Sequence, residues 1–293
     1  MDAAAAIAHV LNATNAGQVL SRGNYRAEYR TLLKLLHPDV CQLPGATAAV
    51  ARLNEYAAEL EALHHLTDAA GPLHVLPPGQ GLRFEGDAAL PRLSVANYRR
   101  LTALADPAAQ HFRQYLPASL AWDGPALLAA TPRPVVPLTG LQLPAEHVAW
   151  VLSRLLELVA WLHQSGFVHA GLVPEALALV PETHGVVAVS FYHLTSLGGP
   201  LTTISGKYRH WYPDEVFATK RATPELDLAL VQRTALYLLG DQSGHGVRLR
   251  GTVDDRLLTF LLEPRHDAYA TFDAYRKLLR QLYPVAKFHP LTL

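Results

Sequence analysis

The stretch Tyr29-Arg30-Thr31-Leu32-Leu33-Lys34-Leu35-Leu36-His37-Pro38-Asp39-Val40 decides how the first part of this chain folds. Apolar side chains before the proline recur every three or four residues, which predicts a helix with one buried face: Tyr25, Tyr29, Leu32, Leu33 and Leu36. Proline lacks an amide hydrogen and disfavours helical backbone at the preceding residue, so we expect the helix to end at His37. Asp39 then favours a tight turn.

A row of cations lies on a second face of the same predicted helix. Its members are spaced four residues apart, which places them one above another: Arg22, Arg26, Arg30 and Lys34. We interpret this face as a surface that docks on an acidic partner, because opposite charge speeds encounter and fixes orientation.

These residues resemble the J-domain, a co-chaperone module in which a basic second helix precedes a His-Pro-Asp loop that stimulates ATP hydrolysis by DnaK-type chaperones. A short helix around Ile7 and a long one over residues 45–63 stand where the family has its first and third helices. Leu53-Asn54-Glu55 matches the family's Ile-Asn-Glu, whereas Tyr56-Ala57 reverses its usual Ala-Tyr. The resemblance implies a J-domain over residues 1–66 that binds its chaperone through His37, Pro38, Asp39, Arg22, Arg26, Arg30 and Lys34.

The bulk composition bounds the class of protein. The chain has 293 residues, half of them hydrophobic, which is enough for two folded domains. Lys+Arg and Asp+Glu both number 25, so bulk positive charge does not favour binding to nucleic acid. The single cysteine, Cys41, excludes an internal disulfide framework. An acidic residue near the start, Asp2, and the lack of a long uncharged apolar run favour a soluble protein of the cytoplasm without a membrane span.

Beyond the first domain, the pattern predicts a linker, a small sheet and then mostly helices. Residues 67–81 are rich in proline and glycine and read as a linker. We expect strands at residues 82–85, 92–95 and 126–129, and one helix over 106–116 with Asp106 as its N-cap. A proline-rich connector follows at 131–137, then helices over 144–166, 224–240 and 271–282 and a strand pair around 185–191.

This order resembles a protein kinase over residues 82–293, with a small lobe at 82–141 and a helical lobe at 142–293. Residues 169–176 follow the His-Arg-Asp-Leu-Lys-Pro-Glu-Asn loop, and His169 matches. However, Gly171 stands for the catalytic-base Asp and Ala176 for the metal-binding Asn. In the Asp-Phe-Gly segment, Ser190 replaces the metal-binding Asp and Phe191 is kept.

The same resemblance implies structural roles for three further residues. Asp227 stands where a helix aspartate holds the backbone of the catalytic loop, and Glu215 and Arg265 stand where the family forms an ion pair. We therefore expect a mainly α protein with a small β lobe, in which a helical J-domain hairpin precedes a degenerate two-lobed kinase-like fold.

Phosphoryl transfer needs a carboxylate to take the hydroxyl proton and oxygen ligands for Mg²⁺. Since these groups are replaced together, we expect no enzyme activity and no cofactor. The 15 histidines lack paired ligand spacing, so we expect no metal site either. The predicted function is a co-chaperone whose pseudokinase domain targets an unidentified client protein to a DnaK-type chaperone.

Two alternatives remain at this stage. In the first, the pseudokinase is a scaffold or inhibitor and the J-like part is structural or blocks a chaperone. In the second, an atypical kinase uses Glu175 or Asp214 as a replacement acid.

Overall fold

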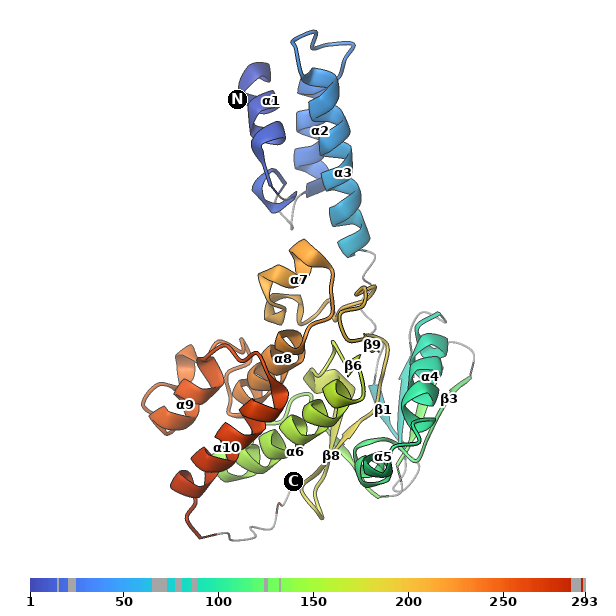
Figure 1. Cartoon of the computed structure of the whole chain (residues 1–293), viewed down its shortest axis with the longest axis vertical. Helices are drawn as coiled ribbons and strands as arrows, with labels where there is room; N and C mark the ends of the chain where they lie inside the picture. Colours follow the sequence, from blue (N-terminus) through green and yellow to red (C-terminus); the bar gives the residue numbers. More distant parts are fainter. Residues whose placement is uncertain are drawn as a thin grey trace. The chain divides into compact units, whose positions relative to one another are not determined.

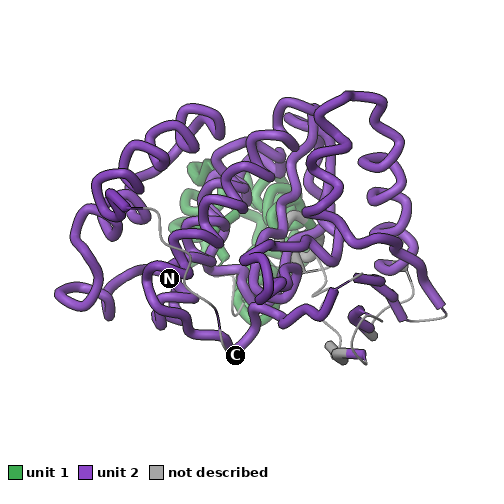
Figure 2. The backbone as a smooth tube through the Cα atoms, turned by 90° about the horizontal axis from the view of Figure 1, so that it is seen from below, with its two compact units in different colours: residues 1–67 green, residues 68–293 purple. Residues whose placement is uncertain are grey.

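The computed structural model describes residues 1–14, 16–20, 25–64, 73–76, 81–85, 89–123, 126–131, 133–285 and 291, with backbone alone for 59–64, 73–75, 85 and 89. The chain divides into two compact units, Met1–Thr67 and Asp68–Leu293, called here the N-terminal and the C-terminal unit (Figure 2). The fold is mainly α with small antiparallel sheets, which confirms the coarse fold class. No helix among the described residues is long and apolar enough to cross a membrane.

The described residues of the N-terminal unit form α1 (Ala3–Asn12), α2 (Tyr25–Leu36) and α3 (Ala46–His64), with a 3₁₀ turn (Ala16–Gln18) between α1 and α2. A short loop joins α2 to α3, and the two helices lie side by side (Figure 1). Asp2 caps α1 by accepting a hydrogen bond of 2.8 Å from the amide of Ala5. The core between the helices includes Val10, Leu36 and Leu53, all fully buried. The helices expected from apolar spacing are therefore present, and α2 ends one residue before His37.

The C-terminal unit begins with a four-stranded antiparallel sheet in the order β1-β2-β4-β3. Its strands are β1 (Leu73–Val75), β2 (Leu82–Glu85), β3 (Ser119–Asp123) and β4 (Ala126–Ala130). The strands expected at 82–85 and 126–129 are confirmed as β2 and β4. In contrast, β1 lies inside the segment expected to be a linker. Three residues are too few for an alternating pattern to be recognised, and this strand is defined by its pairing with β2.

The strand expected at residues 92–95 is wrong, because these residues belong to helix α4 (Ala89–Thr102), which packs on β3 and β4. The buried positions of α4 recur at helical spacing: Leu90, Pro91, Ser94, Val95, Asn97 and Leu101. Ser94 and Asn97 are polar and interrupt the apolar pattern, so the sequence did not indicate a helix here. The expected helix over 106–116 is present as α5 (Pro107–Phe112) followed by a 3₁₀ turn (Arg113–Tyr115), and Asp106 caps it.

The rest of the C-terminal unit is built around the long helix α6 (Ala145–Gln164). Two helices pack on it, α8 (Pro224–Leu238) and α10 (Ala268–Leu282), and Figure 1 shows all three with the shorter α7 (Asp214–Thr219) and α9 (Asp255–Leu262). These bounds confirm the three helices expected from periodicity. The Tyr275 hydroxyl of α10 donates a hydrogen bond of 2.7 Å to the carbonyl of Ala149 in α6. The buried contacts hold the loops between these helices in place.

Short strands flank two loops of the C-terminal unit, residues 169–176 and 189–194. β5 (Val136–Pro137) pairs with β7 (Leu177–Val180), which in turn pairs with β8 (Gly185–Ala188). β6 (Phe167–Val168) pairs with β9 (Thr195–Ser196). The segment 169–176 therefore lies between β6 and β7, and the segment 189–194 lies between β8 and β9.

Candidate functional site

The turn after α2 presents the His-Pro-Asp side chains to solvent. The amides of Val40 and Cys41 each donate a hydrogen bond of 2.8 Å to the His37 carbonyl, which closes the turn. His37 Nδ1 lies 3.4 Å from an Asp39 carboxylate oxygen, and these side chains are 47% and 86% exposed. Pro38 is exposed between them, whereas Cys41 is buried. The turn is thus ordered by its backbone while its three side chains are available to a partner.

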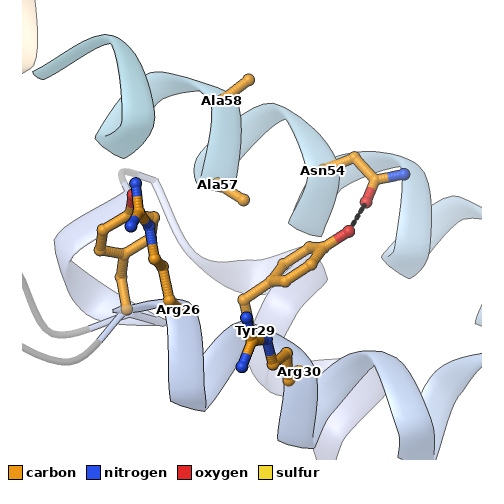
Figure 3. Close-up of a pocket in the computed structure, with 7 residues that line it drawn as sticks. Arg26, Tyr29, Arg30, Asn54, Ala57 and Ala58 are labelled. Atoms are coloured by element: carbon orange, nitrogen blue, oxygen red, sulfur yellow. Dashed lines mark hydrogen bonds between the residues drawn. The ribbon is translucent and has the colours of Figure 1, made fainter. Parts of the chain in front are cut away.

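The cationic face of α2 is exposed next to this turn in the sequence. Arg26, Arg30 and Lys34 are all exposed, and Arg22 lies outside the described residues. A pocket of about 510 Å³ opens between α2 and α3 on the side of Arg26 and Arg30 (Figure 3). Its wall includes Tyr29, whose hydroxyl donates a hydrogen bond of 2.8 Å to Asn54 Oδ1. The described part of the N-terminal unit therefore offers a positively charged, hollowed surface suited to an acidic partner.

In the C-terminal unit, the buried carboxylate of Asp227 holds the backbone of the loop that follows β6. It accepts hydrogen bonds from the amide of His169 at 2.8 Å and from the amide of Ala170 at 2.7 Å. His163 Nε2 lies 3.1 Å from the same carboxylate. Ala170 has φ 57°, an uncommon left-handed backbone for alanine, which this network enforces. The carboxylate thus lies on the loop backbone that the kinase resemblance implies for it.

Helix α4 holds the backbone of Phe191 from the other side. The Phe191 amide donates a hydrogen bond of 2.8 Å to Ser94 Oγ, and Asn97 Nδ2 donates one of 2.9 Å to the Phe191 carbonyl. The Phe191 ring lies between the rings of His169 and Tyr98, with centroid distances of 5.5 and 5.8 Å. A continuous column of aromatic rings therefore connects the loop after β6 with α4.

The space beside Gly171 is filled by the side chain of His193. A Cβ atom added to Gly171 would lie 2.4 Å from Cδ2 of His193. The His193 ring is buried and its Nδ1 lies 2.8 Å from Thr203 Oγ1. Thr203 Oγ1 itself donates to the Tyr192 carbonyl, so His193 Nδ1 is the donor of this pair. Gly171 is therefore the residue that allows His193 to fill this space.

Two buried histidines of this region, His169 and His193, are neutral near pH 7. Burial lowers the pKa of His169 to about 4, against the opposing effect of the Asp227 charge. Burial, together with the nearby His169, lowers the pKa of His193 to about 3. These two rings consequently contribute no positive charge to this loop near pH 7.

The residues present do not fit the Mg²⁺ ions that an active kinase binds. Ala176 and Ser190 are both buried and neither supplies a carboxylate. No group of three or more His, Cys, Asp or Glu side chains in the described part of the chain is placed to hold a metal ion. Glu175, one of the two candidates for a replacement acid in an atypical kinase, forms an ion pair of 2.6 Å with Lys207.

The ion pair implied between Glu215 and Arg265 is not formed. The Arg265 guanidinium instead lies 2.9 Å from a carboxylate oxygen of Glu263 and 4.3 Å from the ring centroid of Phe260. Glu215 is exposed on α7. The physical reason is proximity in the chain, because Glu263 is two residues from Arg265 and reaches the guanidinium within the same loop.

Three residues of this region were missed in the sequence. Ser94 lies in the strand expected at 92–95 and Asn97 follows it without an assigned role, although their spacing with Leu90 and Leu101 is helical. No local signal marks His193, because its role depends on a glycine in a different loop.

In sequence comparisons, no protein-family model and no curated protein matches this chain. Its function is therefore argued from the geometry of these two regions.

Proposed function

We propose that this protein is a J-domain co-chaperone that stimulates the ATPase of a DnaK-type chaperone. The observation that carries the proposal is the exposed turn of His37, Pro38 and Asp39 at the end of a helix with an exposed row of cations. The row draws the acidic surface of the chaperone to α2, where opposite charge raises the encounter rate and fixes the orientation. The turn then contacts the chaperone and promotes hydrolysis there.

In this proposal the C-terminal unit is a kinase-like module that binds a client or a place in the cell and has no activity of its own. Its kinase-like character is supported by the small sheet followed by a helical part, and by the Asp227 carboxylate on the amides of His169 and Ala170. The loss of activity is supported by the His193 ring against Gly171. The protein works in the cytoplasm, where a lone cysteine such as Cys41 stays reduced.

The test is steady-state ATP hydrolysis by a bacterial DnaK-type chaperone in the presence of the purified full chain. We expect stimulation by the unchanged protein and its loss with His37→Gln. The matched control is His9→Gln, which makes the same substitution at an exposed position of α1 and leaves the stimulation unchanged. A second variant, Arg30→Gln with Lys34→Gln, raises the concentration needed for half-maximal stimulation, and this effect shrinks at high salt.

Equal stimulation by the unchanged protein and His37→Gln would refute the proposal. The absence of stimulation from a folded protein, with several DnaK-type chaperones, would also refute it. That second result would favour the alternative in which the C-terminal unit is a scaffold or inhibitor. The hydrogen bonds from the His169 and Ala170 amides to the Asp227 carboxylate support that alternative, because they fix the loop after β6 in one conformation although the loop carries no catalytic carboxylate.

A further inference from the structure

A second pocket of the C-terminal unit lies outside both regions described above. It has a volume of about 590 Å³ and is lined by residues of the 3₁₀ turn after α5, of strand β8 and of helix α6, three elements that contact one another. Neither Asp227 nor the residues of the aromatic column line it. Its volume falls in the range of about 300–1,000 Å³ that is typical of small-molecule sites.

The floor of this pocket is apolar and the rim is basic. Leu116, Val135 and Val187 are buried side chains that line the floor. Three arginines from separate elements line the rim: Arg113 after α5, Arg133 after β4 and Arg154 on α6. A ligand with an apolar body and an anionic end complements these two parts.

The charges at the rim leave an excess of positive charge. Arg154 lies 3.1 Å from Glu157, whose pKa is lowered by hydrogen bonds from Tyr115, His111 and Arg154 despite partial burial. Arg133 lies 3.9 Å from Glu182, a long contact with a carboxylate that is 72% exposed. Within the described residues, the Arg113 guanidinium donates a hydrogen bond of 3.3 Å to the backbone carbonyl of Thr102 and has no carboxylate partner. The three arginines are thus accompanied by two carboxylates, and the contact of Glu182 with Arg133 is the longer one.

A buried hydroxyl at the same pocket also lacks a partner. Thr131 is 2% exposed and lines the pocket, and its Oγ1 makes no hydrogen bond with the described residues. Buried hydroxyl groups are hydrogen-bonded in most proteins, because an unsatisfied one loses its water without compensation. A polar atom of a ligand in this pocket would supply the missing partner.

We propose that this pocket binds a small amphipathic anion, a carboxylate or phosphate on an apolar body. The apolar body lies on Leu116, Val135 and Val187, while the anionic end is held by Arg113 and Arg133 and by the Thr131 hydroxyl. The inference does not depend on the co-chaperone proposal, because it uses none of the residues of the N-terminal unit.

The test is isothermal titration calorimetry of the full chain with four probes below their micelle-forming concentrations. Octanoate and octyl phosphate carry both required parts, octylamine reverses the charge, and inorganic phosphate lacks the apolar body. We expect binding of octanoate or octyl phosphate, and the tighter of the two assigns the anionic group. Octylamine and inorganic phosphate bind at least about tenfold more weakly, because octylamine brings a cation to the arginines and inorganic phosphate has no apolar body to bury.

Variants decide whether that binding uses this pocket. Arg133→Gln and Thr131→Val each lower the affinity for the more tightly bound probe by several-fold. Ala118→Trp, at an exposed position of the pocket wall, prevents its binding. Arg250→Gln removes an exposed arginine elsewhere in the same unit and leaves binding unchanged. Equal binding of octanoate and octylamine would overturn the proposal, as would unchanged affinity in the folded Ala118→Trp variant. Failure of every probe to bind would overturn it as well.

Discussion

Replacing Asp227 with asparagine tests whether this carboxylate holds the loop after β6. The carboxylate is fully buried, and its two oxygens accept from two backbone amides and face one histidine nitrogen. An asparagine side chain keeps one acceptor oxygen and turns the other into an NH₂ group, which faces a donor. One backbone N–H is then left buried without a partner, and the remaining hydrogen bond loses its charge.

The size of the effect follows from these two losses. An unsatisfied buried N–H costs about 1–3 kcal/mol, and replacing a charge-assisted hydrogen bond by a neutral one costs about 1 kcal/mol more. We therefore expect Asp227→Asn to lower the free energy of unfolding of the C-terminal unit by about 3 kcal/mol. The shape of the side chain is unchanged, so the effect measures the hydrogen bonds and the charge.

The assay is urea unfolding followed by tryptophan fluorescence. All four tryptophans belong to the C-terminal unit, at Trp122, Trp150, Trp161 and Trp211, so the signal reports this unit alone. Asp255→Asn makes the same change at an exposed position of α9 and shifts the free energy of unfolding by no more than about 0.5 kcal/mol. A loss of less than about 1 kcal/mol in Asp227→Asn relative to this control would refute the reasoning.

Two further predictions concern the same loop. Gly171→Ala places a Cβ atom against His193, and we expect it to lower the free energy of unfolding of the C-terminal unit by about 1–3 kcal/mol. Adding His193→Ala to the same chain removes the clash and restores part of that loss. Additive effects of the two mutations in a double-mutant cycle would contradict the contact. Acidification is the second perturbation. Because His169 and His193 have pKa values of about 4 and about 3 in the folded protein, the unfolded chain binds protons first as the pH falls below about 6.5. The contribution of the two neutral rings to stability is therefore complete above that pH and falls by about 1.4 kcal/mol per pH unit for each histidine, down to about pH 4 for His169 and about pH 3 for His193. Urea midpoints at pH 7 and 5 check this, and a midpoint that does not move would contradict the burial of both rings as neutral groups.

Local sequence signals were sufficient for several elements of this protein. The helices α2, α3, α6, α8 and α10 follow from apolar residues at helical spacing, and the start of α5 follows from Asp106 before Pro107. The turn at residues 37–39 follows from proline chemistry at the end of a helix. In each case the decisive interactions join residues a few positions apart, so they can be read along the chain.

The tertiary structure decided the features that depend on distant residues. Helix α4 was mistaken for a strand because its buried face includes Ser94 and Asn97, which are buried to bond the backbone of Phe191. The ring of His193 fills the space beside Gly171, and Arg265 pairs with Glu263 in place of Glu215. A polar side chain can be buried only where a hydrogen-bond partner is present, and that partner can be distant in the sequence. Only the folded chain brings the two within hydrogen-bond distance.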